Sequence, residues 1–259
     1  METIPDVLAR YQRQIQLPDI GPDGQRRLLA WRTLVVGLGG LGSPAALYLA
    51  AAGVGTIGLM DPDTVVLSNL QRQILYGTAD LGRNKAQAAE ARLKAIDDKL
   101  CLDILPMALD EANAGELVAG YDFVIDATDQ FAAKFLIARA CLAAGKPYVH
   151  AGVLRHVGQA MTVLPGRTVC PMCLFEDMPP PDDSGPVEGP LGPLPGMLGA
   201  IQAAEAIKCA LGAGQLLINR LLVCDLMTMD VRVIPLRRRP DCPICGAGAP
   251  GNREEPAQG

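Results

Sequence analysis

The stretch Thr33-Leu-Val-Val-Gly37-Leu-Gly39-Gly-Leu-Gly42-Ser-Pro44 decides the fold of this chain. Its apolar start predicts a buried strand, and residues 44–52 predict an apolar helix that ends at Gly53. The glycines between them fit the pattern G-x-G-x-x-G, which brings a phosphate close to the backbone amides of a helix N-terminus. This order of strand, turn and helix indicates a nucleotide site, although NAD and ATP fit the motif equally well.

Strands and helices alternate along the chain on both sides of this turn. Strands are expected at 56–60, 122–126 and 148–152, and helices at 83–100 and 131–144. This alternation predicts an α/β fold with a Rossmann-like, doubly wound, mostly parallel sheet. Residues 159–164 and 220–236 look like strands without helical crossovers, so we expect a mixed or antiparallel C-terminal extension.

We expect one domain over residues 1–246, followed by a disordered Gly/Ala/Pro-rich tail at 247–259. Residues 1–30 are expected to form a helical arm, and 31–165 the nucleotide-binding half. The remainder, 166–246, holds a proline-rich crossing loop at 179–195, a helix at 197–211, a four-cysteine zinc site and the last strands.

Composition excludes several classes of protein. The chain has 259 residues, of which 49% are hydrophobic and 20% charged, so bulk disorder is excluded. A formal net charge of -5 disfavours a nucleic-acid partner. Residues 33–60 carry no charge, but their clustered glycines fit a buried strand and helix better than a membrane span. Because no secretory signal is visible, we expect a cytoplasmic protein with no membrane partner.

A polar run follows the second expected strand. Asn69 and Arg72 lie within it, and Lys85 stands at a helix start, so the two cations can hold the outer phosphates of a triphosphate. Asp61 ends the second strand, where a carboxylate can hold a ribose. Asp129 follows the 122–126 strand and can hold magnesium. The alternatives are a solvated loop for the polar run and a helix-capping role for one of the two aspartates, Asp126 or Asp129.

The cysteines fall into two groups. Four form two C-x-x-C pairs that predict a structural zinc site with no open position: Cys170, Cys173, Cys242 and Cys245. Disulfides are the alternative, which a reducing compartment disfavours. The other four are expected to be buried: Cys101, Cys141, Cys209 and Cys224. For His150 and His156 we expect packing or a backbone hydrogen bond.

Taken together, these motifs resemble the ThiF/MoeB/HesA family of bacterial ubiquitin-activating-like adenylyltransferases over about residues 8–246. The resemblance rests on several segments in the right order. They are residues 10–18, 37–43, 61–65 and 67–73, Gly82 with Lys85, 126–129, both cysteine pairs, and 192–196.

The resemblance implies an activity and roles for individual residues. In this family ATP and magnesium activate the C-terminal glycine of a small ubiquitin-like sulfur carrier protein, which ends in Gly-Gly. Gly39, Gly40 and Asp61 would hold the nucleotide, Asn69, Arg72 and Lys85 would contact the phosphates, and Asp129 would position magnesium. Arg13 resembles an arginine that reaches into the partner protomer's site, which implies a homodimer. The implied catalytic residues are Arg13, Arg72, Lys85 and Asp129.

The chain departs from the family pattern at two positions. Gly185 stands where some members have a cysteine that bonds to the carrier, so we expect the reaction to stop at the acyl adenylate. Gln130 stands where an asparagine often follows the aspartate, so its contact shifts by one methylene. No rhodanese-like extension follows Cys245, so an external sulfur donor is expected.

Two other functions remain as alternatives. A nicotinamide-dependent oxidoreductase is supported only by the glycine turn and Asp61, and it leaves the Asn69, Arg72, Lys85 and Asp129 group unexplained. A non-enzymatic zinc protein that docks a carrier would not need every phosphate-contacting position.

Overall fold

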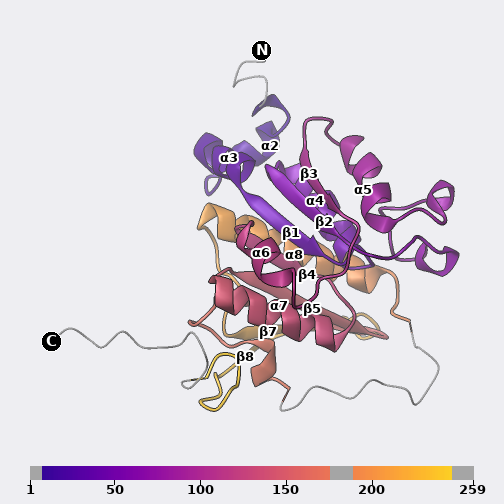
Figure 1. Ribbon diagram of the computed structural model, residues 1–259. Coiled ribbons are helices and arrows are strands. Elements are labelled where there is room, and N and C mark those ends of the chain that lie inside the picture. Colours follow the sequence, from indigo (N-terminus) through magenta and orange to yellow (C-terminus); the bar gives the residue numbers. More distant parts are fainter. Residues whose placement is uncertain (1–7, 176–188, 247–259) are drawn as a thin grey trace.

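Eight strands form one continuous sheet in a computed structural model that describes residues 8–175 and 189–246 (Figure 1). Their order across the sheet is β3-β2-β1-β4-β5-β6-β7-β8. The first five are parallel and the last three antiparallel, which confirms the predicted parallel sheet and antiparallel extension. The strands are β1 Arg32–Val36, β2 Thr56–Met60, β3 Cys101–Leu105, β4 Phe123–Asp126, β5 Tyr148–Leu154, β6 Val157–Val163, β7 Arg220–Asp225 and β8 Asp230–Pro235.

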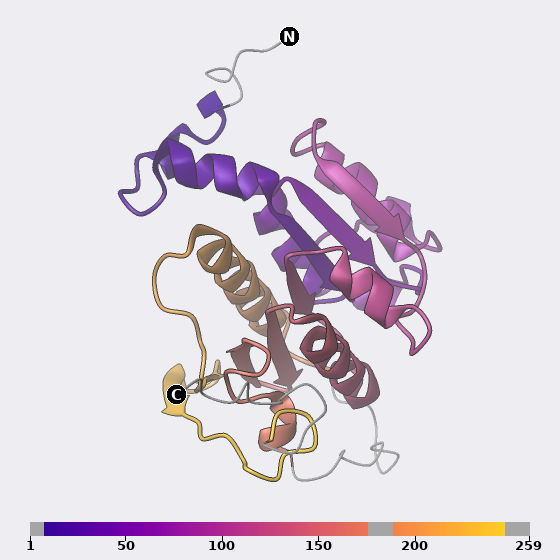
Figure 2. The ribbon, with the colours of Figure 1, turned by 60° about the vertical axis from the view of Figure 1, so that its left-hand side comes forward.

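Helices cover both faces of the sheet. Figure 2 shows α8 on one side and α6 and α7 on the other. The α-helices are α2 Gln12–Ile15, α3 Gly21–Ala30, α4 Gly42–Ala52, α5 Lys85–Lys94, α6 Ala114–Ala119, α7 Phe131–Ala144 and α8 Pro193–Leu211. Short 3-10 turns lie at Leu67–Asn69 (η1), Thr78–Asp80 (η2) and Pro171–Cys173 (η3). The strand order reverses direction between β1 and β4, and such a switch point opens a ligand crevice at the carboxyl ends of the strands.

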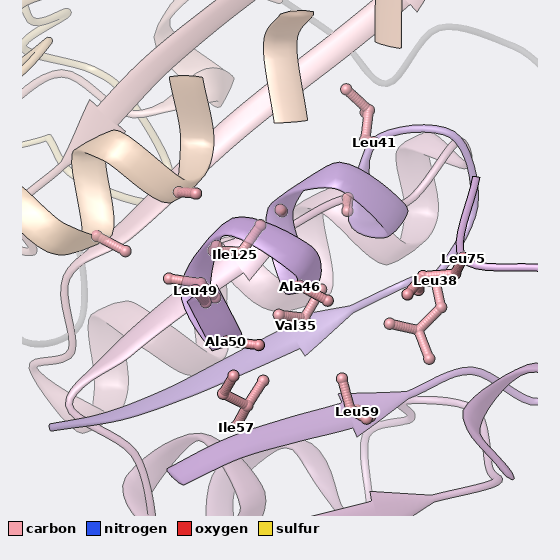
Figure 3. Close-up of a cluster of buried hydrophobic side chains, with 14 of the residues drawn as sticks. Val35, Leu38, Leu41, Ala46, Leu49, Ala50, Ile57, Leu59, Leu75 and Ile125 are labelled. Atoms are coloured by element: carbon pink, nitrogen blue, oxygen red, sulfur yellow. The ribbon is translucent and has the colours of Figure 1, made fainter. Parts of the chain in front are cut away.

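Each face of the sheet has its own apolar core. Under α4, Leu49 packs with Val35, Ile57 and Ile125 of the strands (Figure 3), and all four side chains are inaccessible to solvent. The same core extends to α5 and α8. The opposite core joins α6 and α7 to the segment around the cysteine pairs. The packing of these two cores holds in place the carboxyl ends of the parallel strands, where the site is built.

Several element boundaries differ from the sequence prediction. The helix expected over 83–100 ends at Lys94, and in the turn that follows Asp97 accepts a hydrogen bond from the Lys99 amide. The strand β3 that follows was not predicted. Helix α8 begins at Pro193 rather than at 197, since proline is tolerated in a first helical turn, where amides have no intrahelical partner. The segment 220–236 is a hairpin of two strands, β7 and β8.

Some predictions fall outside the described residues. Gly185, most of the crossing loop and the tail at 247–259 lie there. In the part of the chain that is described, no helix has the length and apolar character needed to cross a membrane.

Candidate active site

The glycine turn between β1 and α4 is closed so tightly that its last position admits only glycine. A Cβ at Gly42 would lie 1.9 Å from the Gly37 carbonyl oxygen. Gly37 adopts φ +89°, and a Cβ there would lie 2.8 Å from the Ala127 carbonyl oxygen at the end of β4. The turn and the segment after β4 are therefore in direct contact.

Asp61, at the end of β2, braces this turn. Its carboxylate accepts hydrogen bonds from the Leu38 amide at 2.8 Å and from the Asp63 amide at 2.9 Å. Burial raises the pKa of Asp61, while nearby Lys85 and the two amide bonds oppose that rise. Each carboxylate oxygen has a second lone pair, so the side chain keeps acceptor capacity for a ribose hydroxyl.

Lys85 begins α5 and points back toward Asp61. Asn84 caps this helix by accepting hydrogen bonds from the amides of Ala86 and Gln87. The Lys85 Nζ lies 2.8 Å from Asp63 Oδ2 and 3.7 Å from Asp61 Oδ2, and its side chain is only 7% exposed. A buried ammonium beside the glycine turn is placed to meet an anionic ligand.

The polar run lies against the glycine turn. The Asn69 carbonyl accepts hydrogen bonds from the amides of Arg72 and Gln73, which folds the run into a compact turn. A Cβ at Gly40 would lie 3.4 Å from Arg72 Cδ, and one at Gly39 would lie 3.6 Å from Gln73 Nε2. The expected nucleotide residues Gly39, Gly40 and Arg72 thus lie side by side.

Gln73 is a site residue that the sequence reasoning did not select. Its side chain is buried, and its Oε1 has no hydrogen-bond partner among the described residues. A buried, unpaired amide oxygen beside Gly39 is an acceptor for a ligand donor. The only signal in the sequence was its place in the polar run.

Asp126, at the end of β4, is the centre of a buried ionic cluster. Its carboxylate contacts Lys134 Nζ at 3.3 Å and His150 Nδ1 at 2.8 Å, and it accepts hydrogen bonds from the Thr128 amide and hydroxyl. Burial disfavours the charge, but Lys134 and His150 outweigh it and lower the pKa of Asp126 to about 2. The bonds to Thr128 fix the loop on which Asp129 stands.

Asp129 and Gln130 lie in the loop after β4, and His150 lies on the neighbouring strand β5. Asp129 and Gln130 are exposed, and the Asp129 carboxylate has no hydrogen bond or ion pair with the described residues. Gln130 occupies the N-cap position of α7 without a side-chain cap, so capping by Asp129 is not observed. His150 was expected to pack or to bind the backbone. It is buried, which confirms packing, and its hydrogen-bond partner is the Asp126 carboxylate, which lies opposite it in the strand pairing.

Arg13 lies on α2, away from the glycine turn of its own chain. Figure 1 shows α2 and α3 beside the start of β1. The neighbouring Gln14 donates a hydrogen bond to the Ala52 carbonyl at the far end of α4. Since α4 has 11 residues, that end is about 16 Å from the glycine turn. Arg13 itself is exposed, and its guanidinium has no partner in the described ranges.

The two C-x-x-C pairs come together as predicted. The Sγ atoms of Cys170, Cys173, Cys242 and Cys245 all lie within 4.8 Å of one another. Two of the separations are 3.6 and 3.3 Å. A tetrahedral zinc with bonds of about 2.3 Å requires sulfur atoms about 3.8 Å apart, so this donor set fits zinc in type and spacing.

Comparison with known proteins identifies the family. The profile of the ThiF family matches residues 11–244, which is nearly the whole described chain. The chain belongs to the ThiF family. This confirms the resemblance drawn from the motifs.

Two curated relatives align over almost their full length. The SAMP-activating enzyme E1 of Haloferax volcanii is 42% identical over 96% of this chain and 92% of its own. The sulfur carrier protein adenylyltransferase of Thermus thermophilus is also 42% identical, over 92% of this chain and 91% of its own. Among solved structures, E. coli MccB superimposes with a TM-score of 0.82 over 92% of this ThiF-family chain and 74% of MccB, at 22% identity. That likeness supports the fold.

Proposed function

We propose that this ThiF-family protein adenylates the C-terminal glycine carboxylate of a small ubiquitin-like sulfur carrier protein, using ATP and releasing pyrophosphate. One observation carries the proposal: the glycine turn, Asp61, Arg72 and Lys85 meet at one edge of the sheet beside the Asp129 loop. Two full-length relatives, each 42% identical, are named as activating enzymes or adenylyltransferases, which supports the same reaction class.

The reaction requires that the carboxylate and the ATP be positioned and that the phosphate charge be neutralised. It does not require a protein nucleophile. The carrier carboxylate attacks the α-phosphate of ATP, forming the acyl–phosphate bond while the bond to pyrophosphate breaks. In our proposal Gly39, Gly40 and Asp61 hold the nucleoside, while Asn69, Arg72 and Lys85 hold the phosphates. Phosphate oxygens replace Asp63 as the partner of Lys85, since the Asp63 side chain is 66% exposed and free to move away.

Magnesium and zinc have separate roles in this proposal. The exposed Asp129 carboxylate is a hard oxygen donor without a partner in the described residues, which suits magnesium. Bound there, magnesium would neutralise phosphate charge. The four thiols would hold a structural zinc, which has no open position for a substrate. We assign residues 1–246 to a single adenylation domain.

The proposed enzyme is a homodimer with two composite sites. Arg13 is held at the far end of α4 from its own glycine turn, so its guanidinium is available to a second copy. A groove of about 310 Å³ lies beside it between α4 and α8, lined mainly by alanines together with Gln14, Tyr48 and Ile207. Tyr48 is 58% exposed there, which favours burial against another protein surface.

Pyrophosphate exchange tests the proposal. Asp129→Ala is expected to abolish ATP–pyrophosphate exchange in the presence of the carrier and to leave the thermal unfolding midpoint unchanged. Glu116→Ala, which removes an exposed carboxylate on α6, serves as the matched control and should exchange at the wild-type rate. Exchange at the wild-type rate in folded Asp129→Ala would overturn the assignment. Tight binding of NAD but not ATP, measured by calorimetry, would favour an oxidoreductase instead.

We further propose that the reaction stops at the acyl adenylate. The thiols outside the four-cysteine cluster are poorly suited to attack: burial raises the pKa of Cys209 to about 11, and Cys141 and Cys224 are buried with raised pKa values. Cys101 was expected to be buried, but it is exposed because β3 begins there. It lies at the opposite end of the parallel strands from the glycine turn.

Intact-mass spectrometry distinguishes a reaction that stops at the acyl adenylate from one that continues to a covalent bond between enzyme and carrier. After incubation with ATP, magnesium and carrier, and without reductant, we expect a carrier–AMP species and an unchanged enzyme mass. A covalent adduct of enzyme and carrier that is cleaved by added thiol would refute the claim that the reaction stops at the acyl adenylate. A peptide map would then identify the cysteine.

A further inference from the structure

The segment that carries Arg13 is anchored by the residues on either side of it. Arg10 Nε lies 3.2 Å from Asp97 Oδ2, and Arg10 also donates to the Ile96 carbonyl at 2.9 Å. The Tyr11 hydroxyl donates to the same Asp97 oxygen at 3.3 Å. On the other side, Gln14 bonds to the Ala52 carbonyl. Arg13 therefore projects from a segment fixed at both ends.

Tyr11 sits in a space that only glycine leaves open. A Cβ at Gly53 would lie 2.5 Å from Tyr11 Cζ and 2.8 Å from Gln25 Nε2. Gly53 ends α4 with φ +79°. The same residue therefore terminates the helix and leaves the space that the Tyr11 ring occupies. The Tyr11 side chain is buried, unlike every residue of α2 itself. Burial and the Asp97 carboxylate raise the pKa of Tyr11, so its hydroxyl stays a donor.

We infer that Asp97, Tyr11 and Gly53 form a latch that positions Arg13 for the active site of the partner protomer. This inference rests on the proposed composite dimer. Asp97 follows α5 and is 86 residues from Tyr11, so the latch links the arm to the body of its own chain. Its effect is expected in the other protomer, because Arg13 lies on α2, at the far end of α4 from the glycine turn of its own chain.

The latch matters because an arginine that meets a phosphate must be placed accurately. A misplacement of about 1 Å in an active site can cost about 100-fold in rate. The helix α2 has four residues and buries none of them, so it cannot hold this position by its own packing. The side chains of Arg10, Tyr11 and Gln14 do so instead. Asp97 is thus a positioning residue, far from the reacting atoms.

The first test uses homodimers. Asp97→Ala and Gly53→Ala are each expected to lower ATP–pyrophosphate exchange about tenfold or more, with the dimer retained in light scattering. Gly145→Ala is the matched control: it also places alanine at a left-handed helix end, φ +65°, but its Cβ would meet nothing within 4 Å. The control should exchange at the wild-type rate. Equal losses in Gly53→Ala and Gly145→Ala would overturn the role of the Tyr11 seat.

The second test uses mixed dimers purified through two different tags. With Asp97→Ala on one protomer and Asp129→Ala on the other, one site has all its residues and an intact arm. We expect about half of the wild-type exchange. With both substitutions on one protomer and a wild-type partner, the intact site receives the misplaced arm, and exchange should fall to about one twentieth.

A latch that served only its own protomer would give the opposite pattern, and that result overturns the inference. Arg13→Ala in place of Asp97→Ala separates this failure from failure of the proposed function. If Arg13→Ala follows the expected pattern and Asp97→Ala does not, the composite site stands and the latch is wrong. If Asp129→Ala homodimers still exchange, the proposed function itself fails. A monomeric wild type would refute the composite dimer and with it the latch.

Discussion

At the scale of single residues, the cluster of Asp126, Lys134 and His150 is an ionic group whose side chains are each 6% exposed or less. Removing Lys134 leaves the buried Asp126 carboxylate without its cationic partner, in a place that water does not reach. Lys134→Met should therefore lower the free energy of unfolding by about 3–5 kcal/mol, measured by urea denaturation. Lys146→Met, on a partly exposed lysine without an ion pair among the described residues, is the control and should change it little. A loss below 1 kcal/mol, as for a surface pair, would show that Asp126 is not ionised.

The same cluster predicts how stability depends on pH. Burial and Lys134 lower the pKa of His150, so below its ordinary value of about 6.5 the unfolded chain binds a proton that the folded chain does not. The lowered pKa of Asp126 adds to the free energy of unfolding. This addition is complete above about pH 4 and is lost as the pH falls toward 2. Acid therefore destabilises the fold in two steps, the first beginning near pH 6.5.

His150→Gln isolates the first step, because glutamine can still donate to Asp126 but does not titrate. We expect its unfolding free energy to fall less between about pH 7 and 5 than that of the wild type. Identical slopes in the two proteins would assign the acid sensitivity to other groups.

At the scale of elements, sequence reasoning succeeded where local pattern decides. The apolar run, the glycines and Gly53 specify β1, the turn and α4 without help from distant residues. It failed at β3, because Leu100 continues the apolar spacing of the preceding helix up to the first residue of the strand, and Asp103 is unusual in a strand. Asp103 is tolerated there because it accepts hydrogen bonds from Arg32 and Tyr121, which are far away in sequence. The contact of His150 with Asp126 was missed for the same reason.

The turn before α4 gives the prediction at this scale. Gly42→Ala places a Cβ against the Gly37 carbonyl, so α4 cannot start where it does. We expect a loss of at least about 2 kcal/mol in unfolding free energy and no measurable ATP binding by calorimetry. Gly115→Ala, inside α6 with open space around it, should instead gain up to about 1 kcal/mol. Native ATP affinity in Gly42→Ala would mean that the turn does not hold the nucleotide.

At the scale of the whole molecule, the cysteine cluster closes the chain on itself. It joins η3, which follows β6, to the segment that follows β8, and these segments are 72 residues apart at both sulfur contacts. Three of the four cysteines are buried and contribute to the core beneath α7. The sequence revealed the ligands through their spacing, but their place in this core depends on the course of all the strands between them.

Loss of the metal should therefore increase local unfolding on the side of the sheet that carries the cysteine cluster and leave the side that carries α4 unchanged. Cys173→Ser is expected to bind no zinc in elemental analysis and to lose about 3 kcal/mol, which lowers the Tm by about 6–12 °C in a chain of this size. Hydrogen exchange should increase in η3, β8 and the residues after it. It should stay unchanged in α4, whose core lies on the opposite face of the sheet.

Cys101→Ser is the matched control, since Cys101 is exposed and lies outside the cluster; it should keep both the zinc and the Tm. Native protein without zinc would refute the metal site outright. If Cys173→Ser loses zinc but exchanges hydrogen faster in α4 as well, the two cores unfold together. The ATP site would then depend on the zinc through the cooperativity of the whole sheet rather than being independent of it.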